Sequence, residues 1–273
     1  MKSTCRLLTI LPLTLCLTGC EFISNAISSY WQTYNDKSEP FSPPENNQWI
    51  TVEGVIPPKT TPILTRRYIS NKCLSTHNTA GGTLYHTPRH RGDDVNVSVN
   101  PTTGYFKEKI PLQGGGWCQW KINTISVSII YTEVNHLIKD AVPYTGTGIK
   151  AFINGAEKPK KMKEFLNIID YKPTIYPFLR RDYEDGDKIG LYGKSGGLTY
   201  FGLRLTPGNE WKISYMPTLD ESKMPKIIIS ENTEPNAYPR AKARVEYPDG
   251  KVDLDSDYIE YWKINNTSQW ESK

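Results

Sequence analysis

The chain has 273 residues and a mass of 31.1 kDa, with 37% hydrophobic and 23% charged residues. The apolar fraction is too high for a wholly disordered chain, and no apolar run reaches about 18 residues, which excludes a polytopic membrane protein. Basic residues number 33 and acidic residues 29. Because the two signs are interspersed, the charge does not indicate a nucleic-acid partner. The 20 glycines, 20 prolines and 17 tyrosines favour a turn-rich β protein.

The first 20 residues have the layout of a bacterial lipoprotein signal. Lys2 and Arg6 supply positive charge, and a short apolar stretch follows over residues 7–17. The sequence Leu17-Thr18-Gly19-Cys20 resembles the lipobox, in which the cysteine thiol is diacylated before the signal is cleaved. The resemblance implies that residues 1–19 form a signal peptide and that Cys20 carries the lipid.

The residue after the lipobox cysteine bears on the destination. In such lipoproteins an Asp at this position typically causes retention in the inner membrane, whereas this chain has Glu21. The resemblance therefore implies a lipid-anchored protein of the outer membrane that faces the periplasm, with an anchor made effectively permanent by its three acyl chains. Residues 20–48 are polar, with prolines near the end, and predict a lipidated tether.

Two cysteines remain after the signal and the lipid site are set aside. Cys5 and Cys16 leave with the signal, so that Cys73 and Cys118 form an even pair in an oxidising compartment. A disulfide between them would close a loop of about 45 residues and contribute roughly 3–4 kcal/mol. Two buried free thiols are the alternative. A catalytic cysteine is less expected, because Cys118 lies in a segment typical of a core strand.

From Trp49 onward the pattern predicts an antiparallel, sandwich-like β domain over residues 49–142. Segments rich in β-branched and aromatic residues are separated by Pro, Gly and Asn, and residues 94–99 alternate with the period of a half-buried strand. The expected strands are 49–56, 63–70, 95–99, 105–112, 117–122 and 126–134. The predicted disulfide would join strands within this domain.

A second β-rich domain is predicted over residues 143–273, after a linker at 143–148. Helical spacing of Met162, Phe165, Leu166 and Ile169 predicts a helix over 158–170. The other expected elements are strands at 189–192, 198–205, 211–215 and 226–229, a hairpin at 245–252, and a helix or strand at 257–264. The whole chain is thus predicted to be mainly β (a β-rich α+β fold) with one or two short helices.

One motif of hydrolases is present but lacks its partners. Gly193-Lys194-Ser195-Gly196-Gly197 matches G-x-S-x-G, the motif that presents a nucleophilic serine at a strand-to-helix turn. The general base would have to follow the serine, yet all four histidines precede it, and the next segment is strand-like. The same run lacks the first glycine of a P-loop. A glycine-rich hairpin turn is the expected structure, so that we predict no catalytic residue and no enzyme.

Candidate metal sites are equally incomplete. Cys73, His77, His86 and His90 lie close in sequence, but their spacing is not that of a zinc knuckle, and solvated loops are expected. The acidic runs 182–187 and 253–257 lack the glycine and glutamate positions of an EF-hand loop. We therefore predict no metal and no cofactor. The four lysines within 158–163 predict a solvated face, with steering of an acidic partner as the minority interpretation.

A last motif suggests a family. The run Gly114-Gly115-Gly116-Trp117-Cys118, together with the lipobox, resembles small bacterial envelope lipoproteins. Some of these are immunity proteins for antibacterial phospholipase effectors of type VI secretion systems. The resemblance implies a protein partner, a secreted lipase effector, whose active site the chain would block. The alternative is a structural or assembly lipoprotein of an envelope secretion or surface-polymer machine. The sequence does not identify the partner-binding residues.

Overall fold

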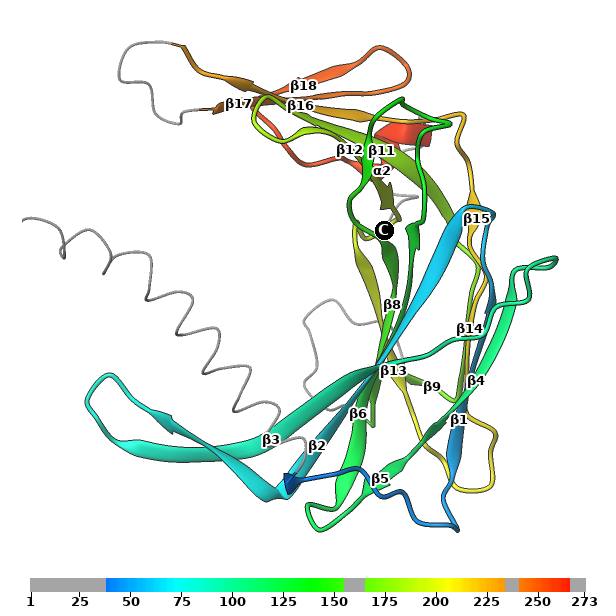
Figure 1. Cartoon of the computed structure of the whole chain (residues 1–273), viewed down its shortest axis with the longest axis vertical. Coiled ribbons are helices and arrows are strands. Elements are labelled where there is room, and N and C mark those ends of the chain that lie inside the picture. The colour runs from blue at the N-terminus through cyan, green and yellow to red at the C-terminus, as the bar shows by residue number, and fades with distance from the viewer. Residues whose placement is uncertain (1–37, 155–164, 234–240, 266–273) are drawn as a thin grey trace, which may run out of the picture.

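The computed structural model describes residues 38–154, 165–233 and 241–265 (Figure 1). These residues form three β-sheets and a short helix, α2 (Tyr261–Asn265), so that the predicted mainly-β class is confirmed. None of the helical segments described is long and apolar enough to cross a bilayer. Cys20 and residues 1–37 lie outside the described residues.

The first sheet, called here the β2 sheet, contains the longest strand described, β2. The strand order of this sheet is β3-β2-β6-β8-β13-β9, with β5 beside β6. The bounds are β2 (Thr60–Asn78), β3 (Leu84–Val95), β5 (Gln113–Gly115), β6 (Trp120–Tyr131), β8 (Thr147–Ile153), β9 (Phe165–Leu166) and β13 (Leu198–Leu203). Because β2 has 19 residues, it extends well beyond its pairing with β6.

Two further sheets complete the structure. The β1 sheet has the order β10-β14-β1-β4, and the β11 sheet has the order β18-β17-β16-β11-β12-β7, with β15 beside β11. The β1 sheet consists of β1 (Trp49–Val55), β4 (Tyr105–Pro111), β10 (Ile168–Tyr171) and β14 (Lys212–Tyr215). The β11 sheet consists of β7 (Val142–Pro143), β11 (Thr174–Asp182), β12 (Gly186–Tyr192), β15 (Thr218–Leu219), β16 (Lys226–Glu231), β17 (Ala241–Glu246) and β18 (Val252–Leu254).

Two hydrophobic cores meet at β11. Successive side chains of a strand point to opposite faces, and β11 buries both of its faces. Ile175 and Leu179 enter the main core, which also takes residues of the β1 and β2 sheets. Tyr176 and Phe178 enter a second core, which includes Ile264 of α2. The hairpin β11–β12 is therefore shared between the two cores, and residues on both of its faces fix its position.

The predicted division at residues 142/143 is not a division between sheets. Pairings within residues 49–142 are antiparallel, as expected, but strands of this region also pair with later ones. β1 lies parallel to β14, and β6 lies antiparallel to β8. Local patterns predict where strands are, whereas these pairings depend on contacts far apart in sequence, which the patterns do not encode.

Several predicted elements need correction. Residues 165–166 and 168–171 of the predicted helix 158–170 are β9 and β10, because parallel pairing with β13 and β14 buries Ile169 in the main core. Residues 158–164 lie outside the described part. The predicted linker 143–148 contains the end of β7 and the start of β8. The predicted strand 95–99 is mostly loop, since β3 ends at Val95. The hairpin 245–252 is confirmed by β17 and β18.

The β2–β3 hairpin projects away from the rest of the protein (Figure 1). The last β2 residue paired with β6 is Ile69, and beyond it β2 pairs only with β3. We call residues 70–90 the ribbon. Its register shifts between Ser70 and Leu74, where a β-bulge is located. Both faces of this two-stranded segment are largely exposed, so its position depends on what holds its base.

Candidate functional site

The run Gly114-Gly115-Gly116 receives a segment that precedes the first strand. Residues 38–43, called here the strap, lie along this run, and the Ser42 N–H donates to the Gly114 carbonyl at 2.8 Å. A Cβ on Gly115 would overlap the Ser42 carbonyl oxygen, and one on Gly116 would lie 2.5 Å from that of Pro40. Both glycines also have positive φ, which other residues rarely adopt. The glycine run is therefore a receptor for the strap.

Tryptophans and arginines hold the strap in place. The Trp117 indole donates to the Ser38 carbonyl at 2.8 Å, and that of Trp120 donates to the Glu39 carbonyl at 3.3 Å. The Arg91 guanidinium donates to the same Glu39 carbonyl, while Arg89 donates to the Glu39 carboxylate at 2.5 Å. Because the Glu39 side chain is only 10% exposed, this ion pair is far less screened than a surface pair.

Phe41 fills the space between the strap and the β2 sheet. Its ring centroid lies 4.9 Å from that of Tyr68 and 6.0 Å from that of Trp120. The Arg91 guanidinium lies 4.2 Å from the Phe41 ring centre, within the range of a cation–π interaction. Tyr68 is buried, which raises the pKa of its hydroxyl to about 12. The end of the predicted tether 20–48 is therefore packed onto the β structure.

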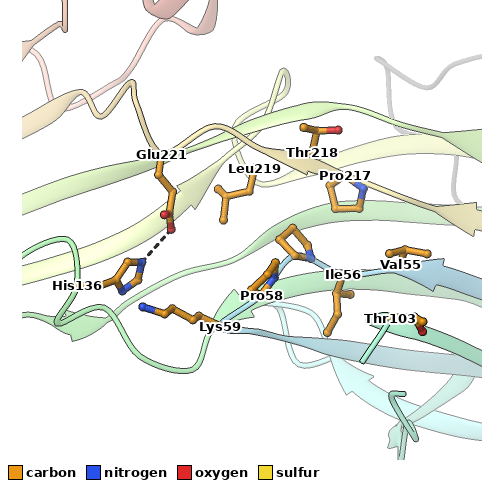
Figure 2. Close-up of a pocket in the computed structure, with 11 residues that line it drawn as sticks. Val55, Ile56, Pro58, Lys59, Thr103, His136, Pro217, Thr218, Leu219 and Glu221 are labelled. Atoms are coloured by element: carbon orange, nitrogen blue, oxygen red, sulfur yellow. Dashed lines mark hydrogen bonds and ion pairs between the residues drawn. The ribbon is translucent and has the colours of Figure 1, made fainter. Parts of the chain in front are cut away.

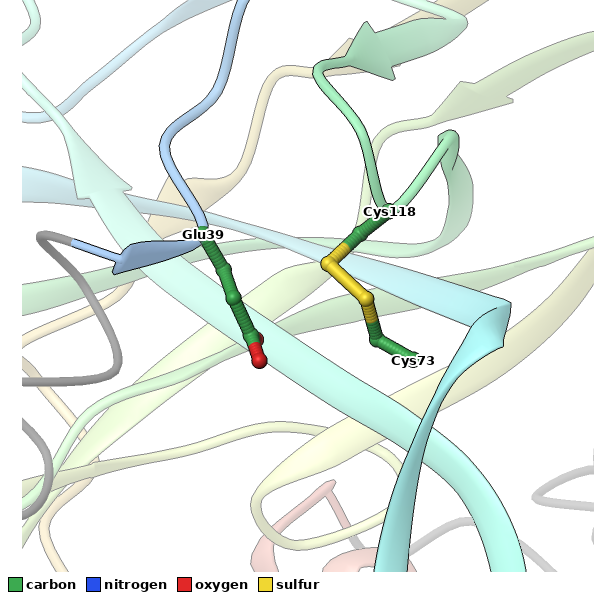
Figure 3. A group of neighbouring side chains, drawn as sticks. All are labelled: Glu39, Cys73 and Cys118. Carbon is green, nitrogen blue, oxygen red and sulfur yellow. A yellow bond between two sulfur atoms is a disulfide. The ribbon is translucent and has the colours of Figure 1, made fainter.

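The predicted disulfide is present beside the strap. Cys73 and Cys118 are bonded, with 5.3 Å between their Cα atoms, and both are buried (Figure 3). The Ser70 hydroxyl donates to the Cys118 carbonyl at 2.6 Å and accepts from the Cys73 N–H at 2.8 Å. The bond therefore fixes the base of the ribbon to the loop that receives the strap.

The disulfide and Glu39 are close enough to resemble a metal site. One ligand atom from each of Glu39, Cys73 and Cys118 lies within 4.8 Å of the others. Zinc and similar ions bind thiolates, and a sulfur engaged in a disulfide carries no thiolate charge. Glu39 is already paired with Arg89. With the disulfide formed, this group holds the strap and does not provide metal ligands.

The histidines considered for zinc all lie on the ribbon and do not converge. Thr76 is paired with His86, and its hydroxyl lies 3.1 Å from the His86 ring nitrogen. His77 lies on the opposite face, where its ring nitrogen is 2.9 Å from the Thr87 hydroxyl and its ring stacks on Tyr85. With Cys73 engaged in the disulfide, these side chains form cross-strand contacts on both faces and no common site.

A surface cavity lies at the start of β2, away from the strap. It has a volume of about 660 Å³ and is lined mainly by Ile56, Leu219 and three prolines, with polar groups at its edge (Figure 2). The His136 ring nitrogen lies 3.0 Å from the Glu221 carboxylate, and the Tyr131 hydroxyl donates to the same oxygen at 2.8 Å. An apolar cavity with a few polar groups at its edge is typical of a binding site.

The charges of the cavity are mutually compensated. Burial by itself raises the pKa of the Glu221 carboxyl, but hydrogen bonds from His136 and Tyr131 outweigh it, and the net pKa lies below its usual 4.5. Lys59 lies 3.4 Å from Glu133, and its backbone has a φ of 61°. The lining residues include no serine or cysteine that could act as a nucleophile. The arrangement is suited to binding.

Ser195 of the G-x-S-x-G motif lies in a tight turn between β12 and β13. Gly193 and Gly196 exchange backbone hydrogen bonds at 3.0 and 2.9 Å, and Gly196 has a φ of 76°. The Ser195 hydroxyl accepts a hydrogen bond from Thr199 at 3.2 Å. The four histidines belong to the β2–β3 hairpin and to the cavity, so that Ser195 forms no dyad with any of them. The expected glycine-rich turn is present, but it joins strands of two different sheets, so that β12 and β13 do not form a hairpin.

The two acidic runs are ion-paired turns. In the run 182–187, Asp187 pairs with Arg181 at 2.6 Å and Asp185 with Lys188 at 2.7 Å. In the run 253–257, Asp253 pairs with Lys263 at 2.7 Å. These carboxylates therefore have basic partners where a calcium site would need them to converge on an ion. The lysine-rich segment 158–163 lies outside the described residues.

Comparisons of this chain with protein-family models, with curated proteins and with solved structures gave no match. The site therefore has to be interpreted from its geometry. Two features were missed from the sequence: the strap and the His136–Glu221 cavity. Glu39-Pro40-Phe41, an acidic and an aromatic residue within a proline-rich tether, is the signal that could have indicated the strap.

Proposed function

We propose that the chain is a periplasm-facing outer-membrane lipoprotein that binds and neutralises a type VI secretion phospholipase effector. Two features support the proposal: the lipobox at Cys20 and the resemblance carried by the Gly-Gly-Gly-Trp-Cys run. An immunity protein needs a rigid scaffold and a docking surface, because it acts by occupying its partner's site.

The observation that carries the proposal is the separation of two sites along β2, one near the middle of the strand and the other at its start. The strap, through which an anchored chain would leave the fold, is clamped at the base of the ribbon. The cavity is lined by residues 55–59, which directly precede β2. An anchor attached through the strap leaves the cavity facing the periplasm, where an incoming effector arrives. Tethering also raises the local concentration of the inhibitor at the membrane that the phospholipase attacks.

The lipid anchor is tested separately from the binding activity. In the producing bacterium the native protein should begin at Cys20, carry acyl chains by mass spectrometry and fractionate with the outer membrane. The Cys20→Ala variant should keep its signal uncleaved or lose the acyl mass. An intact terminus at Met1, or the wild-type protein in the cytosol, would contradict the proposed anchor.

The binding activity is tested with the mature chain, residues 20–273 with Cys20→Ser, and the purified product of any phospholipase gene found to neighbour its own. We expect a stable complex and loss of phospholipase activity at equimolar inhibitor. Thr218→Arg, at an exposed residue of the cavity, should weaken binding at least tenfold. Leu254→Arg, on a residue 74% exposed in β18, serves as the control.

The outcomes separate the two functional classes. No complex and no inhibition by the wild-type chain would exclude the immunity function. A stable complex with envelope assembly proteins, formed when no effector is present, would support the alternative of an assembly lipoprotein. Binding that is unaffected by Thr218→Arg would retain the immunity function but place the docking surface outside the cavity.

A further inference from the structure

The ribbon has an unusual charge distribution. From Tyr68 through Gly92 the chain contains no Asp or Glu, whereas Lys72, Arg89 and Arg91 lie in this stretch together with three of the four histidines. Glu39 of the strap neutralises Arg89, and Lys72 and Arg91 keep the net charge of this stretch positive. Such a segment complements an anionic surface, and the interspersed charges of the whole chain make this local bias distinctive.

Exposed apolar side chains gather toward the end of the same ribbon. Leu84 and Tyr85 are 63% and 46% exposed, and they directly follow the turn at 79–83, which has no charged residue. Leu84 is paired with Asn78 and Tyr85 with His77, so the two side chains lie on opposite faces. Leu74, 44% exposed, lies further back. Because these apolar side chains lie on both faces of the ribbon, they do not fit a single groove on a protein partner.

The order of side chains along the ribbon matches the depth profile of a bilayer surface. An uncharged turn forms the end, Leu84 and Tyr85 follow, His77 and His86 lie beside and behind them, and Lys72 and Arg89 lie near the base. Aromatic residues favour the headgroup level, and basic residues favour the zone in front of anionic headgroups. Trp117, 55% exposed, adds an aromatic residue at the base, where it contacts the strap.

The length of chain before the strap permits this contact. Residues 21–37 number 17 (37 − 20 = 17) and reach at most about 60 Å when extended, whereas the ribbon from Ser70 to Asn78 is about 25 Å long. The strap begins at the ribbon's base, so a lipid at Cys20 would keep the ribbon within reach of the membrane. This proximity rests on the proposed anchor, while the charge and exposure of the ribbon do not.

We propose that the ribbon is a second membrane contact, which inserts the turn at 79–83 with Leu84 and Tyr85 into the headgroup region of an anionic phospholipid bilayer. The contact fixes the orientation of the protein on the membrane, with the cavity at the far end of β2 directed away from the lipid. The occupant is thus a lipid surface bearing negative headgroups, such as phosphatidylglycerol.

The test uses the non-acylated mature chain, residues 20–273 with Cys20→Ser, and flotation with vesicles. One set contains phosphatidylethanolamine and phosphatidylglycerol at 3:1, and the other contains phosphatidylcholine alone. We expect binding to the first set, reduced by salt and much weaker on the second. Leu84→Ser/Tyr85→Ser should weaken binding at least tenfold, and Lys72→Gln about fivefold.

Matched controls remove equivalent side chains elsewhere. Leu254→Ser/Tyr258→Ser changes a leucine and a tyrosine that are 74% and 62% exposed on the β11 sheet and near α2, and Lys226→Gln changes an exposed lysine of β16. These variants should bind vesicles as the wild type does. The ribbon side chains are solvent-exposed, so the urea unfolding midpoints of all variants should remain close to that of the wild type.

Each outcome of the vesicle assay supports or overturns the proposed membrane contact of the ribbon. No binding of the wild-type chain to anionic vesicles, or equal binding by the ribbon variants, would overturn the proposal. Ribbon variants that bind vesicles normally but lose the phospholipase effector would overturn it in favour of a protein-docking ribbon. Because the vesicle assay contains no effector and the effector assay contains no vesicles, failure of this inference is distinguishable from failure of the proposed function.

Discussion

The Ser42 carbonyl oxygen occupies the place where a side chain on Gly115 would have to lie. This contact joins the strap to the glycine run and leads to a direct test. Gly115→Ala should cost about 1–2 kcal/mol for its φ of 61°, and more because Ser42 must move. Urea unfolding measures the total loss, and limited proteolysis before Trp49 should reveal release of the strap.

A matched glycine separates the two contributions. Gly186 has a φ of 77°, and nothing lies within 4 Å of the position of its Cβ. Gly186→Ala should therefore cost only the backbone term and leave the strap resistant to protease. Equal losses for the two variants, with the strap protected in both, would show that Gly115 has no role as a strap receptor.

The disulfide should contribute substantially to stability. Cys73 and Cys118 are separated by 45 residues, so replacing both by Ala should lower the free energy of unfolding by about 3–4 kcal/mol in the chain-entropy description. Wild-type protein unfolded in the presence of a reductant should match this variant. Hydrogen exchange should also become faster in the ribbon, whose base the bond secures. An unchanged unfolding midpoint would contradict the expectation.

An ion pair in the β1 sheet predicts loss of stability in acid. The Glu53 carboxylate lies 2.7 Å from the Lys212 ammonium on the neighbouring strand, and this hydrogen bond lowers the pKa of Glu53 below its usual 4.5 despite partial burial. A lowered folded-state pKa contributes stability above about pH 4.5, and the contribution is lost as the pH falls through the folded value.

Glu53→Gln should therefore be less stable than the wild type at pH 7, and the difference should shrink steadily below pH 4.5. Urea midpoints between pH 3 and 7 measure it. Glu45→Gln, at an exposed residue, is the control and should show no such trend. A Glu53→Gln deficit that persists unchanged at pH 3 would rule out the ion pair as its cause.

A buried amide in β6 offers a stabilising substitution. Asn123 is 1% exposed, and neither polar atom of its side chain has a hydrogen-bond partner among the described residues. An unsatisfied buried polar group costs about 1–3 kcal/mol, so Asn123→Val should raise the free energy of unfolding by about 1 kcal/mol. Asn100→Val is the contrasting change, because Asn100 accepts from two N–H groups and its loss should destabilise. A destabilised Asn123→Val variant would refute the expectation.

Local sequence patterns predicted those features that depend on neighbouring residues. The strand predicted over 49–56 is β1, and the Pro-Asp-Gly turn at 248–250 predicted the β17–β18 hairpin. The alternation at 94–99, by contrast, predicted a strand where the chain is mostly loop. Helical spacing failed at Ile169, because parallel pairing with β14 outweighed a weak local preference. The disulfide was predicted from the oxidising compartment and from the even number of cysteines left in the mature chain. Neither consideration requires knowledge of the fold.

The sequence by itself determined the mainly-β class, the cysteine pair and the resemblance of the first 20 residues to a lipoprotein signal. Only the tertiary structure decided that strands on the two sides of residue 143 share sheets, that Gly115 receives Ser42, and that His136 meets Glu221 beside a cavity. The reason is physical. The alternation of buried and exposed residues depends only on a few neighbouring residues. Each of these contacts joins segments far apart in sequence, and whether they meet depends on how the whole chain folds.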